Sequence, residues 1–346
     1  MAASELVAFV QVFLLLLTPI GSAPKERIAL FPIIKDGKLG YIERSGQIKL
    51  PPQFEPPCPN CEPEVDVTGV FREGLVGAKK GSTWGFVDED GTWIVRPEYD
   101  SIKPFSDGLA AVEVAGKWGF IDHTGKLAIP LKFSWAEGFS EGLAAVEISA
   151  DNKPTGTGFI DKFGRFVVPS NYSAAYGFSE GLAPVQLGTK MGYIDHSGKV
   201  VIKPKFDVAF GFKEGLAQVH VGLKAGFIDT HGQLIAEPQF DIAADFSDGM
   251  AGVFKKVGEN WLSGYIDKTG KVAVQLQFEY VRDFSEGKAP VQIGSKWGYI
   301  DAKGAIVIQP MFDDAHSFRD GLARVKMNWL DAYIDETGKV IWISTR

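Results

Sequence analysis

Two cysteines, Cys58 and Cys61, have the spacing that most directly suggests chemistry. They are the only cysteines of the chain and lie in the segment PPCPNCEPEVDV. A C-x-x-C pair can be a redox centre, half of a zinc site or a small structural disulfide. A zinc site needs further ligands and a redox centre needs a thioredoxin-like βαβ pattern, and neither accompanies the pair. We therefore expect a local Cys58–Cys61 disulfide if the chain is secreted.

Asp and Glu side chains recur at two fixed places along the chain, and repeated carboxylates can bind calcium or act as paired acids and bases. One place opens Asp-x-x-Gly segments, as in Asp122 and Asp195, and the other is Phe-Ser-acid-Gly, as in Glu141. A carboxylate that opens a type I turn accepts backbone N–H groups, so capping explains the first set. The five His residues show no metal-ligand spacing. We expect no catalytic residue, no metal site and no cofactor.

These carboxylates belong to a repeat that fills nearly the whole chain, and its clearest copy is FSEGLAPVQLGTKMGYIDHSGKVVIKPKFD at 178–207. Each copy is marked by a glycine before an aromatic residue, with an alanine in the ninth place: Gly40, Gly85, Gly119, Gly158, Gly192, Gly226, Gly264, Gly298 and Ala332. Five of the eight spacings are 34 residues, and the other three are longer by 11, 5 and 4. The sequence therefore predicts nine units of about 34 residues, with insertions at 51–68, 149–156 and 256–262.

Each unit has the pattern of three β-strands, at 143–148, 157–161 and 165–169 in the fourth unit. The third strand contains a proline, which cannot donate to a β-ladder, so this strand must end there or lie at an edge. A lone unit must offset about 1.5 kcal/mol of ordering per residue, so neighbouring units must supply buried area. We expect one repeated phenylalanine per unit to pack between neighbours: Phe105, Phe139, Phe178, Phe212, Phe246, Phe284 and Phe318.

Both terminal units contain all three strands, because 30–33 aligns with 182–185 and the last unit runs through 339–343. No strand is visibly donated from one end of the chain to the other. We therefore expect an all-β tandem array that is open, solenoid-like or superhelical. A closed ring of complete units, like a propeller or toroid, is the alternative.

The N-terminal region predicts the cellular compartment. Residues 6–20, LVAFVQVFLLLLTPI, form an apolar run followed by Gly21-Ser22-Ala23, which is typical of a secretory leader. We expect a signal peptide at 1–23 and a repeat domain at 24–346, with an uncleaved N-terminal anchor as the alternative. The net charge is −7 and the basic residues are scattered, which argues against nucleic-acid binding. We predict a secreted or periplasmic protein with no membrane contact beyond the leader.

The motifs KWGFID at 117–122 and KWGYID at 296–301, with the trailing Gly-Lys and Pro-x-Phe-Asp, resemble the WG (KWG) repeat family. The resemblance covers about residues 28–343 and implies a β-rich array used for binding or scaffolding, with no catalytic residues. The tryptophan of the motif is present only at Trp84, Trp118 and Trp297. These indoles either form an exposed row that binds sugar or peptide, or pack in the core.

We therefore predict a non-enzymatic extracytoplasmic scaffold or binding module for protein or peptide partners. The alternative is a carbohydrate-binding or carbohydrate-active cell-surface protein that uses the Trp-bearing repeats.

Overall fold

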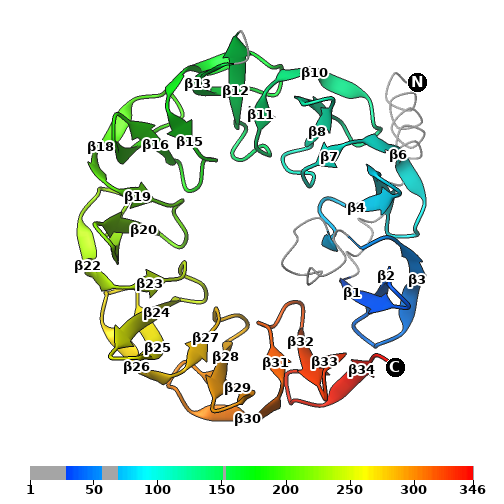
Figure 1. Cartoon of the computed structure of the whole chain (residues 1–346), viewed down its shortest axis with the longest axis vertical. Helices are drawn as coiled ribbons and strands as arrows, with labels where there is room; N and C mark the ends of the chain where they lie inside the picture. The colour runs from blue at the N-terminus through cyan, green and yellow to red at the C-terminus, as the bar shows by residue number, and fades with distance from the viewer. Residues whose placement is uncertain (1–28, 57–68, 151–152, 346) are drawn as a thin grey trace, which may run out of the picture.

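A computed structural model describes residues 29–56, 69–150 and 153–345 of the chain. These residues form nine small antiparallel sheets that follow one another around a closed ring, as the blades of a β-propeller (Figure 1). The prediction of an all-β array of nine repeated units is confirmed. The expectation of an open array is wrong, and the ring that we kept as the alternative is the observed arrangement. No helix within the described ranges has the length and apolar character needed to cross a membrane.

Blades 1 and 2 have three strands each. They are β1 (Leu30–Lys35), β2 (Lys38–Glu43) and β3 (Ile48–Phe54) in blade 1, and β4 (Leu75–Lys80), β5 (Thr83–Asp88) and β6 (Trp93–Tyr99) in blade 2.

Blades 3 to 9 have four strands each, paired in chain order. Blade 3 contains β7 (Ser101–Ile102), β8 (Ala110–Val114), β9 (Lys117–Ile121) and β10 (Leu127–Phe133); blade 4 contains β11 (Trp135–Ala136), β12 (Ala144–Ala150), β13 (Lys153–Ile160) and β14 (Phe166–Tyr172); blade 5 contains β15 (Ala174–Ala175), β16 (Ala183–Leu187), β17 (Lys190–Ile194) and β18 (Val200–Phe206). Blade 6 contains β19 (Val208–Ala209), β20 (Leu216–Val221), β21 (Lys224–Asp229) and β22 (Leu234–Phe240); blade 7 contains β23 (Ile242–Ala243), β24 (Met250–Val257), β25 (Asn260–Asp267) and β26 (Val272–Phe278). Blade 8 contains β27 (Tyr280–Val281), β28 (Lys288–Ile293), β29 (Lys296–Asp301) and β30 (Ile306–Phe312); blade 9 contains β31 (Asp314–Ala315), β32 (Leu322–Met327), β33 (Leu330–Asp335) and β34 (Val340–Ile343).

The first strand of each four-stranded blade is one that the sequence analysis missed. It has only two residues, such as Val208 and Ala209 of β19, which pair with His220 and Val219 of β20. Two residues are too few to show the alternation of apolar and polar side chains that indicates a strand. The segment that we took as a simple crossing between units therefore supplies an extra strand to each of these blades.

The glycine of the repeat is required by the outer strand that crosses it. β30 contains Pro310, and the register between β29 and β30 shifts beside this residue. A Cβ atom at Gly298 would lie 2.6 Å from the carbonyl oxygen of Ile308 and 2.8 Å from the nitrogen of Pro310, which is too close.

The outer strand of blade 9 has no proline, and its Ile343 pairs directly with Ala332. Blade 7 also lacks this proline, yet it keeps the register shift, and a Cβ atom at Gly264 would lie 2.5 Å from the carbonyl oxygen of Val274. The register shift therefore requires the glycine, and blade 9 accepts Ala332 because no shift lies beside it.

The core lies between the blades. Phe178 is 2% exposed and belongs to a cluster that joins Phe159 and Val168 of blade 4 to Val185 and Ile194 of blade 5. Each of the seven predicted phenylalanines is at most 3% exposed. Their role as side chains packed between neighbouring units is therefore confirmed.

The ring closes between blades 9 and 1 without a shared strand (Figure 1). Phe31 and Ile33 of blade 1 pack with Leu322 and Tyr333 of blade 9. The Tyr333 hydroxyl also donates a 2.8 Å hydrogen bond to the carbonyl oxygen of Pro32. The missing strand donation therefore gave no information about closure, because packing between complete blades closes this ring.

Candidate binding surface in the central channel

The segments that meet at the centre of the ring are six-residue loops, which we call the inner loops. In blades 3 to 9 each connects the short first strand to the first long strand of the same blade, and the loop of blade 5 is Tyr176–Gly181, with the sequence YGFSEG. We number the loop positions 1 to 6. Eight such loops are described: 69–74, 103–108, 137–142, 176–181, 210–215, 244–249, 282–287 and 316–321.

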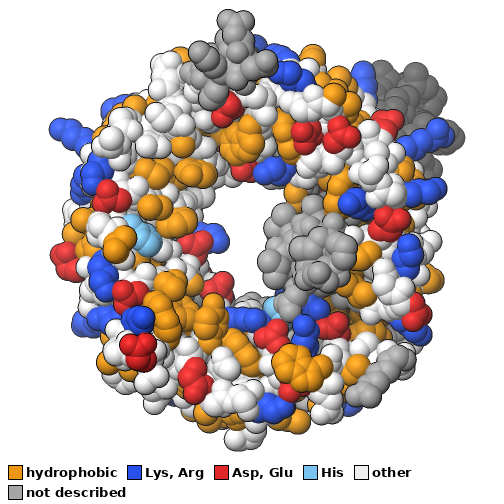
Figure 2. All heavy atoms as spheres, viewed as in Figure 1, with side chains coloured by type: hydrophobic (Ala, Val, Ile, Leu, Met, Phe, Trp, Pro, Cys, Tyr) orange, Lys and Arg blue, Asp and Glu red, His pale blue; other side chains and the backbone are white. Residues whose placement is uncertain are grey.

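The inner loops line two cavities in the central opening, which Figure 2 shows along the ring axis. One cavity of about 630 Å³ is lined mainly by the loops of blades 3 to 6, and one of about 830 Å³ mainly by those of blades 7 to 9. Arg72 of blade 2 contributes to both. The channel wall is therefore a continuous surface to which most blades contribute the same loop.

A chain of hydrogen bonds holds the inner loops in place. The acidic residue at position 5 accepts the N–H of the position 6 glycine in the next blade, as Glu180 does from Gly215 at 2.7 Å. The same bond joins these pairs: Glu73–Gly108, Asp107–Gly142, Glu141–Gly181, Glu214–Gly249, Asp248–Gly287 and Glu286–Gly321. The position 5 residues have φ between 49° and 55°, a region that non-glycine residues seldom occupy. From the sequence we expected only that this segment crosses from one unit to the next. The hydrogen bond between the acidic residue and the glycine of the next blade was not predicted.

Position 4 and the blade aromatics add further links. The Ser140 hydroxyl donates to the carbonyl oxygen of Phe178 at 2.6 Å, and Ser106 does the same to Phe139. Where the repeat has tyrosine, its hydroxyl donates to the position 1 carbonyl of the next loop, as Tyr193 does to Phe210 at 2.8 Å. Positions 3, 5 and 6 thus form a frame that differs little between blades, whereas position 4 is serine in five loops and Arg72, Lys213 or Arg319 in the other three.

Position 1 carries a different side chain in each blade, and position 2 varies between blades. Position 1 is occupied by Gly69, Lys103, Glu137, Tyr176, Phe210, Ala244, Arg282 and His316, and position 2 by Val70, Pro104, Gly138, Gly177, Gly211, Asp245, Asp283 and Ser317. At positions 1 and 2, blades 4 to 6 therefore present three glycines, the aromatic rings of Tyr176 and Phe210, and the carboxylate of Glu137. Blades 7 to 9 present charged and polar groups.

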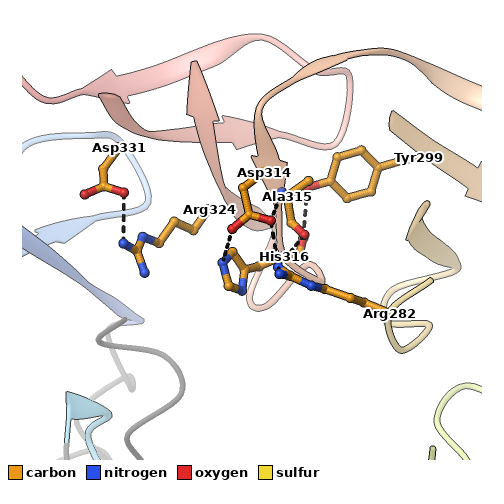
Figure 3. A network of polar contacts seen from close by, with 7 residues as sticks. All are labelled: Arg282, Tyr299, Asp314, Ala315, His316, Arg324 and Asp331. Atoms are coloured by element: carbon orange, nitrogen blue, oxygen red, sulfur yellow. Dashed lines mark hydrogen bonds and ion pairs between the residues drawn. The ribbon is translucent and has the colours of Figure 1, made fainter. Parts of the chain in front are cut away.

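The polar part of the wall at blades 8 and 9 is held by a network around Asp314 (Figure 3). The Arg282 guanidinium lies 3.0 Å from the Asp314 carboxylate and donates to the Ala315 carbonyl oxygen at 2.7 Å. His316 lies 3.4 Å from the other Asp314 oxygen, and its carbonyl oxygen accepts from Tyr299 at 2.8 Å. These contacts fix the position 1 side chains of two neighbouring loops.

Asp283 has an altered acidity at this wall. The residue is exposed, but nearby protein atoms reduce the solvation of its carboxyl and so raise its pKa. The positive charge of Lys213 opposes that shift, whereas the negative charge of Asp245 adds to it. Lys213 itself pairs with Asp245 at 2.8 Å. Charged groups from three consecutive loops thus lie close enough along this wall to influence one another.

The aspartate of Pro-x-Phe-Asp joins neighbouring blades away from the channel. Asp207 accepts a hydrogen bond from Lys190 of blade 5 at 2.6 Å and another from the Gly222 N–H of blade 6 at 2.8 Å. These two bonds lower the pKa of Asp207. The sequence showed this repeated aspartate but not its partners, because a lysine 17 residues before it and a glycine N–H 15 residues after it form no local motif.

The Asp-x-x-Gly carboxylates are turn caps, as predicted. Asp122 Oδ1 accepts from the backbone N–H groups of Thr124 and Lys126 at 2.9 and 3.1 Å. The bond from the Thr124 hydroxyl is the main cause of the lowered pKa of Asp122. Within the ranges that the structure describes, no group of three or more His, Cys, Asp or Glu side chains could hold a metal ion.

The three tryptophans proposed as binding aromatics pack between blades. Trp118 is 9% exposed and Trp297 is 7% exposed, and each belongs to a hydrophobic cluster. Trp84 is partly buried against such a cluster and has Lys79 5.6 Å from its ring centre. They do not line the channel cavities. The tryptophan motif therefore did not lead to Tyr176 and Phe210, the exposed aromatics of the channel.

Two other predictions fall on residues that the structure does not describe. The leader at 1–23 lies outside the described ranges, and so does the Cys58–Cys61 pair. Both stay predictions.

Among curated proteins no sequence matches the chain, whereas solved structures do match it. Matching solved structures include the tricorn protease (12% identity, TM-score 0.26, covering 90% of this chain and 39% of that one). A KlHsv2 protein with loop 6CD replaced by a Gly-Ser linker is 9% identical, with a TM-score of 0.37, and the match covers 79% of this chain and 94% of that one. A putative TolB from Agrobacterium tumefaciens is 10% identical, with a TM-score of 0.30, and the match covers 52% of this chain and 84% of that one. The chain spans about two fifths of the tricorn protease, and none of these likenesses bears on function.

A family model described as "WG containing repeat" matches seven consecutive stretches of the chain: 84–118, 118–150, 158–190, 191–222, 226–261, 264–297 and 297–328. Six of the seven fall in the four-stranded blades, and together they cover well over half of the sequence. The protein is therefore a member of the WG containing repeat family, folded as a nine-bladed β-propeller.

Proposed function

We propose that the protein is a non-enzymatic, extracytoplasmic scaffold that binds a protein or peptide partner through its central channel. The observation that carries the proposal is the contrast between constant and variable positions within the inner loops. Positions 3, 5 and 6 repeat a fixed frame, while positions 1, 2 and, in three loops, 4 vary on a concave surface. Repeat proteins bind partners in this way, with loops that a rigid scaffold holds in place.

The rigidity of the frame supports a binding role. Every described loop except that of blade 9 is tied to the next through its acidic residue, and each position 3 phenylalanine from blade 3 onward is at most 3% exposed. Side chains at positions 1 and 2 are thus displayed without being needed for packing. A partner that contacts several loops at once would not have to order them first, which lowers the entropic cost of binding.

The proposed location rests on the sequence. The apolar run at 6–20 with its small residues at 21–23 is typical of a secretory leader, and the C-x-x-C pair suits an oxidising compartment. A secretion assay with the full-length chain, followed by N-terminal sequencing of the exported product, tests this part of the proposal.

The carbohydrate alternative has less support. It required the Trp-bearing repeats to expose their indoles, and Trp118 and Trp297 are more than nine-tenths buried. A sugar site would therefore have to use other residues.

An affinity capture experiment with chemical crosslinking tests the proposal. The bait is residues 24–346, applied to the extracytoplasmic fraction of the native cells. A channel variant, Lys103→Ala/Phe210→Ala/Asp283→Ala, changes three separate parts of the wall.

The matched control carries three substitutions of exposed side chains outside the two channel cavities, Phe163→Ala/Leu223→Ala/Trp329→Ala. We expect one protein to be captured by the wild type and the control and lost with the channel variant. Capture of the same proteins by all three baits, or of none by the wild type, would contradict channel binding.

A further inference from the structure

Three glycines line the cavity at position 2, and the fold does not require glycine at two of them. Position 2 is glycine in three consecutive blades, Gly138, Gly177 and Gly211. Neither Gly138 nor Gly177 has a positive φ, and a Cβ atom would meet nothing within 4 Å at Gly138 and nothing closer than 3.9 Å at Gly177. The equivalent positions of other blades hold Pro104, Asp245, Asp283 and Ser317. The backbone tolerates side chains here, so their absence at Gly138 and Gly177 leaves open space beside the cavity, whereas a Cβ atom at Gly211 would meet Ser179.

The second observation is that large aromatic rings stand beside this space. Tyr176 is 50% exposed and Phe210 is 42% exposed, and both line the 630 Å³ cavity with the three glycines. Their backbones are fixed, because the Tyr176 N–H donates to Pro184 and the Phe210 N–H donates to Gln218. Exposed aromatic rings on a rigid backbone are typical of binding surfaces for apolar groups.

The third observation is that the charged side chains beside the glycines are paired; Arg72 of blade 2, which lines the same cavity, is the exception among the described residues. Lys103 pairs with Glu137 at 3.3 Å on one side of the glycines, and Lys213 pairs with Asp245 at 2.8 Å on the other. The Ser140 hydroxyl is used by the Phe178 carbonyl. A sugar needs several free hydrogen-bonding groups for its hydroxyls, and a charged ligand needs an unpaired opposite charge. The wall of blades 4 to 6 therefore suits an uncharged and largely apolar ligand.

One polar atom at this wall has no partner. The Ser179 hydroxyl is buried and makes no hydrogen bond with the described residues, although the serines of the two preceding loops do. It lies beside Gly211, where a Cβ atom would approach its Oγ to 2.9 Å. Buried polar groups are nearly always satisfied, and Ser179 belongs to the cavity lining, so a rotation of its side chain toward the cavity would let the hydroxyl donate to an external acceptor, such as a peptide carbonyl.

From these observations we propose that blades 4 to 6 hold a binding site for an extended, uncharged peptide segment that presents aromatic or proline side chains. The side chains stack on Tyr176 and Phe210, the peptide backbone lies over the three glycines, and Ser179 donates to one peptide carbonyl. This inference rests on the proposed scaffold function and names the chemistry of its partner.

Selection from a displayed library of short random peptides on the folded mature chain tests the site. The dissociation constants of the enriched peptides are then measured by fluorescence anisotropy. One test variant, Gly177→Asp, copies the residue of blade 8 and fills the open space, and a second, Tyr176→Ala/Phe210→Ala, removes the rings. Phe163→Ala is the matched control, because this side chain is 80% exposed and lies outside the channel.

We expect uncharged peptides with aromatic or proline residues to be enriched, and each test variant to weaken binding by about tenfold or more. The control should bind like the wild type. Enrichment of charged peptides, or equal affinity of wild type and test variants, would overturn the assignment. Sugar binding on a glycan array that is lost in the same variants would also overturn it. If the captured partner is lost with the channel variant but kept with Gly177→Asp, the scaffold function stands and this site fails.

Discussion

Replacing a single position 3 phenylalanine should destabilise the whole ring, wherever the blade lies in the sequence. Phe178 is 2% exposed, its ring centre lies 4.8 Å from that of Phe159, and it stacks on His196 at 4.4 Å. Phe318, in the last blade, is also 2% exposed and lies 5.0 Å from Tyr299. Phe→Ala changes in well-packed cores cost about 3–5 kcal/mol. We expect each change to lower the free energy of unfolding by about that amount.

Denaturant unfolding, followed by hydrogen exchange resolved by blade, measures both effects. In a closed ring no blade is terminal, so Phe318→Ala should reduce protection throughout the chain, as Phe178→Ala does. Loss of protection confined to blade 9 in Phe318→Ala would refute this reasoning and would mean that the seam between blades 9 and 1 contributes little.

Three further predictions follow from individual contacts. Tyr193→Phe should lower the free energy of unfolding by about 0.5–1.5 kcal/mol, because it removes a hydrogen bond between blades. Phe159→Tyr should be tolerated, because its new hydroxyl can form the same kind of bond with the next loop. Chemical denaturation of both variants tests this. The lowered pKa of Asp207 means that its stabilisation is present above the unfolded value of about 3.9 and is lost as pH falls through the folded value, so Asp207→Asn should flatten the acid side of the stability profile. Intact mass should show the Cys58–Cys61 disulfide, and Cys→Ser changes should leave the melting temperature nearly unchanged, since the closed loop is very short.

Most of the repeat could be predicted because its signals are local. The period, the three long strands, the Asp-x-x-Gly caps and the packing of Phe178 all depend on residues within one unit or its neighbour. The short inner strands could not be predicted, because two residues such as Val208 and Ala209 carry no periodicity. The reason for Ala332 also became clear only from the register of the last outer strand, which has no shift beside this residue.

The closed ring and the channel surface depend on contacts that no local pattern encodes. Closure rests on packing between Phe31 and Tyr333, which are about 300 residues apart, and complete blades need no donated strand. The channel aromatics Tyr176 and Phe210 occupy position 1, which in the other loops is Gly, Lys, Glu, Ala, Arg or His. A position that varies between units looks like an ordinary loop in the sequence, and it becomes a candidate site only when the ring brings the loops together.

A distance measurement across the seam tests the closed ring most directly. Spin labels at Ile48 and Val340 mark the start of the outer strands of blades 1 and 9, and labels at Val200 and Leu234 mark the same place in blades 5 and 6. All four positions are exposed, and both native cysteines are replaced by serine for labelling. A closed ring predicts the same distance for the two pairs, since each joins adjacent blades. A distance between 48 and 340 that is much longer than that between 200 and 234 would contradict closure and, with it, the central channel.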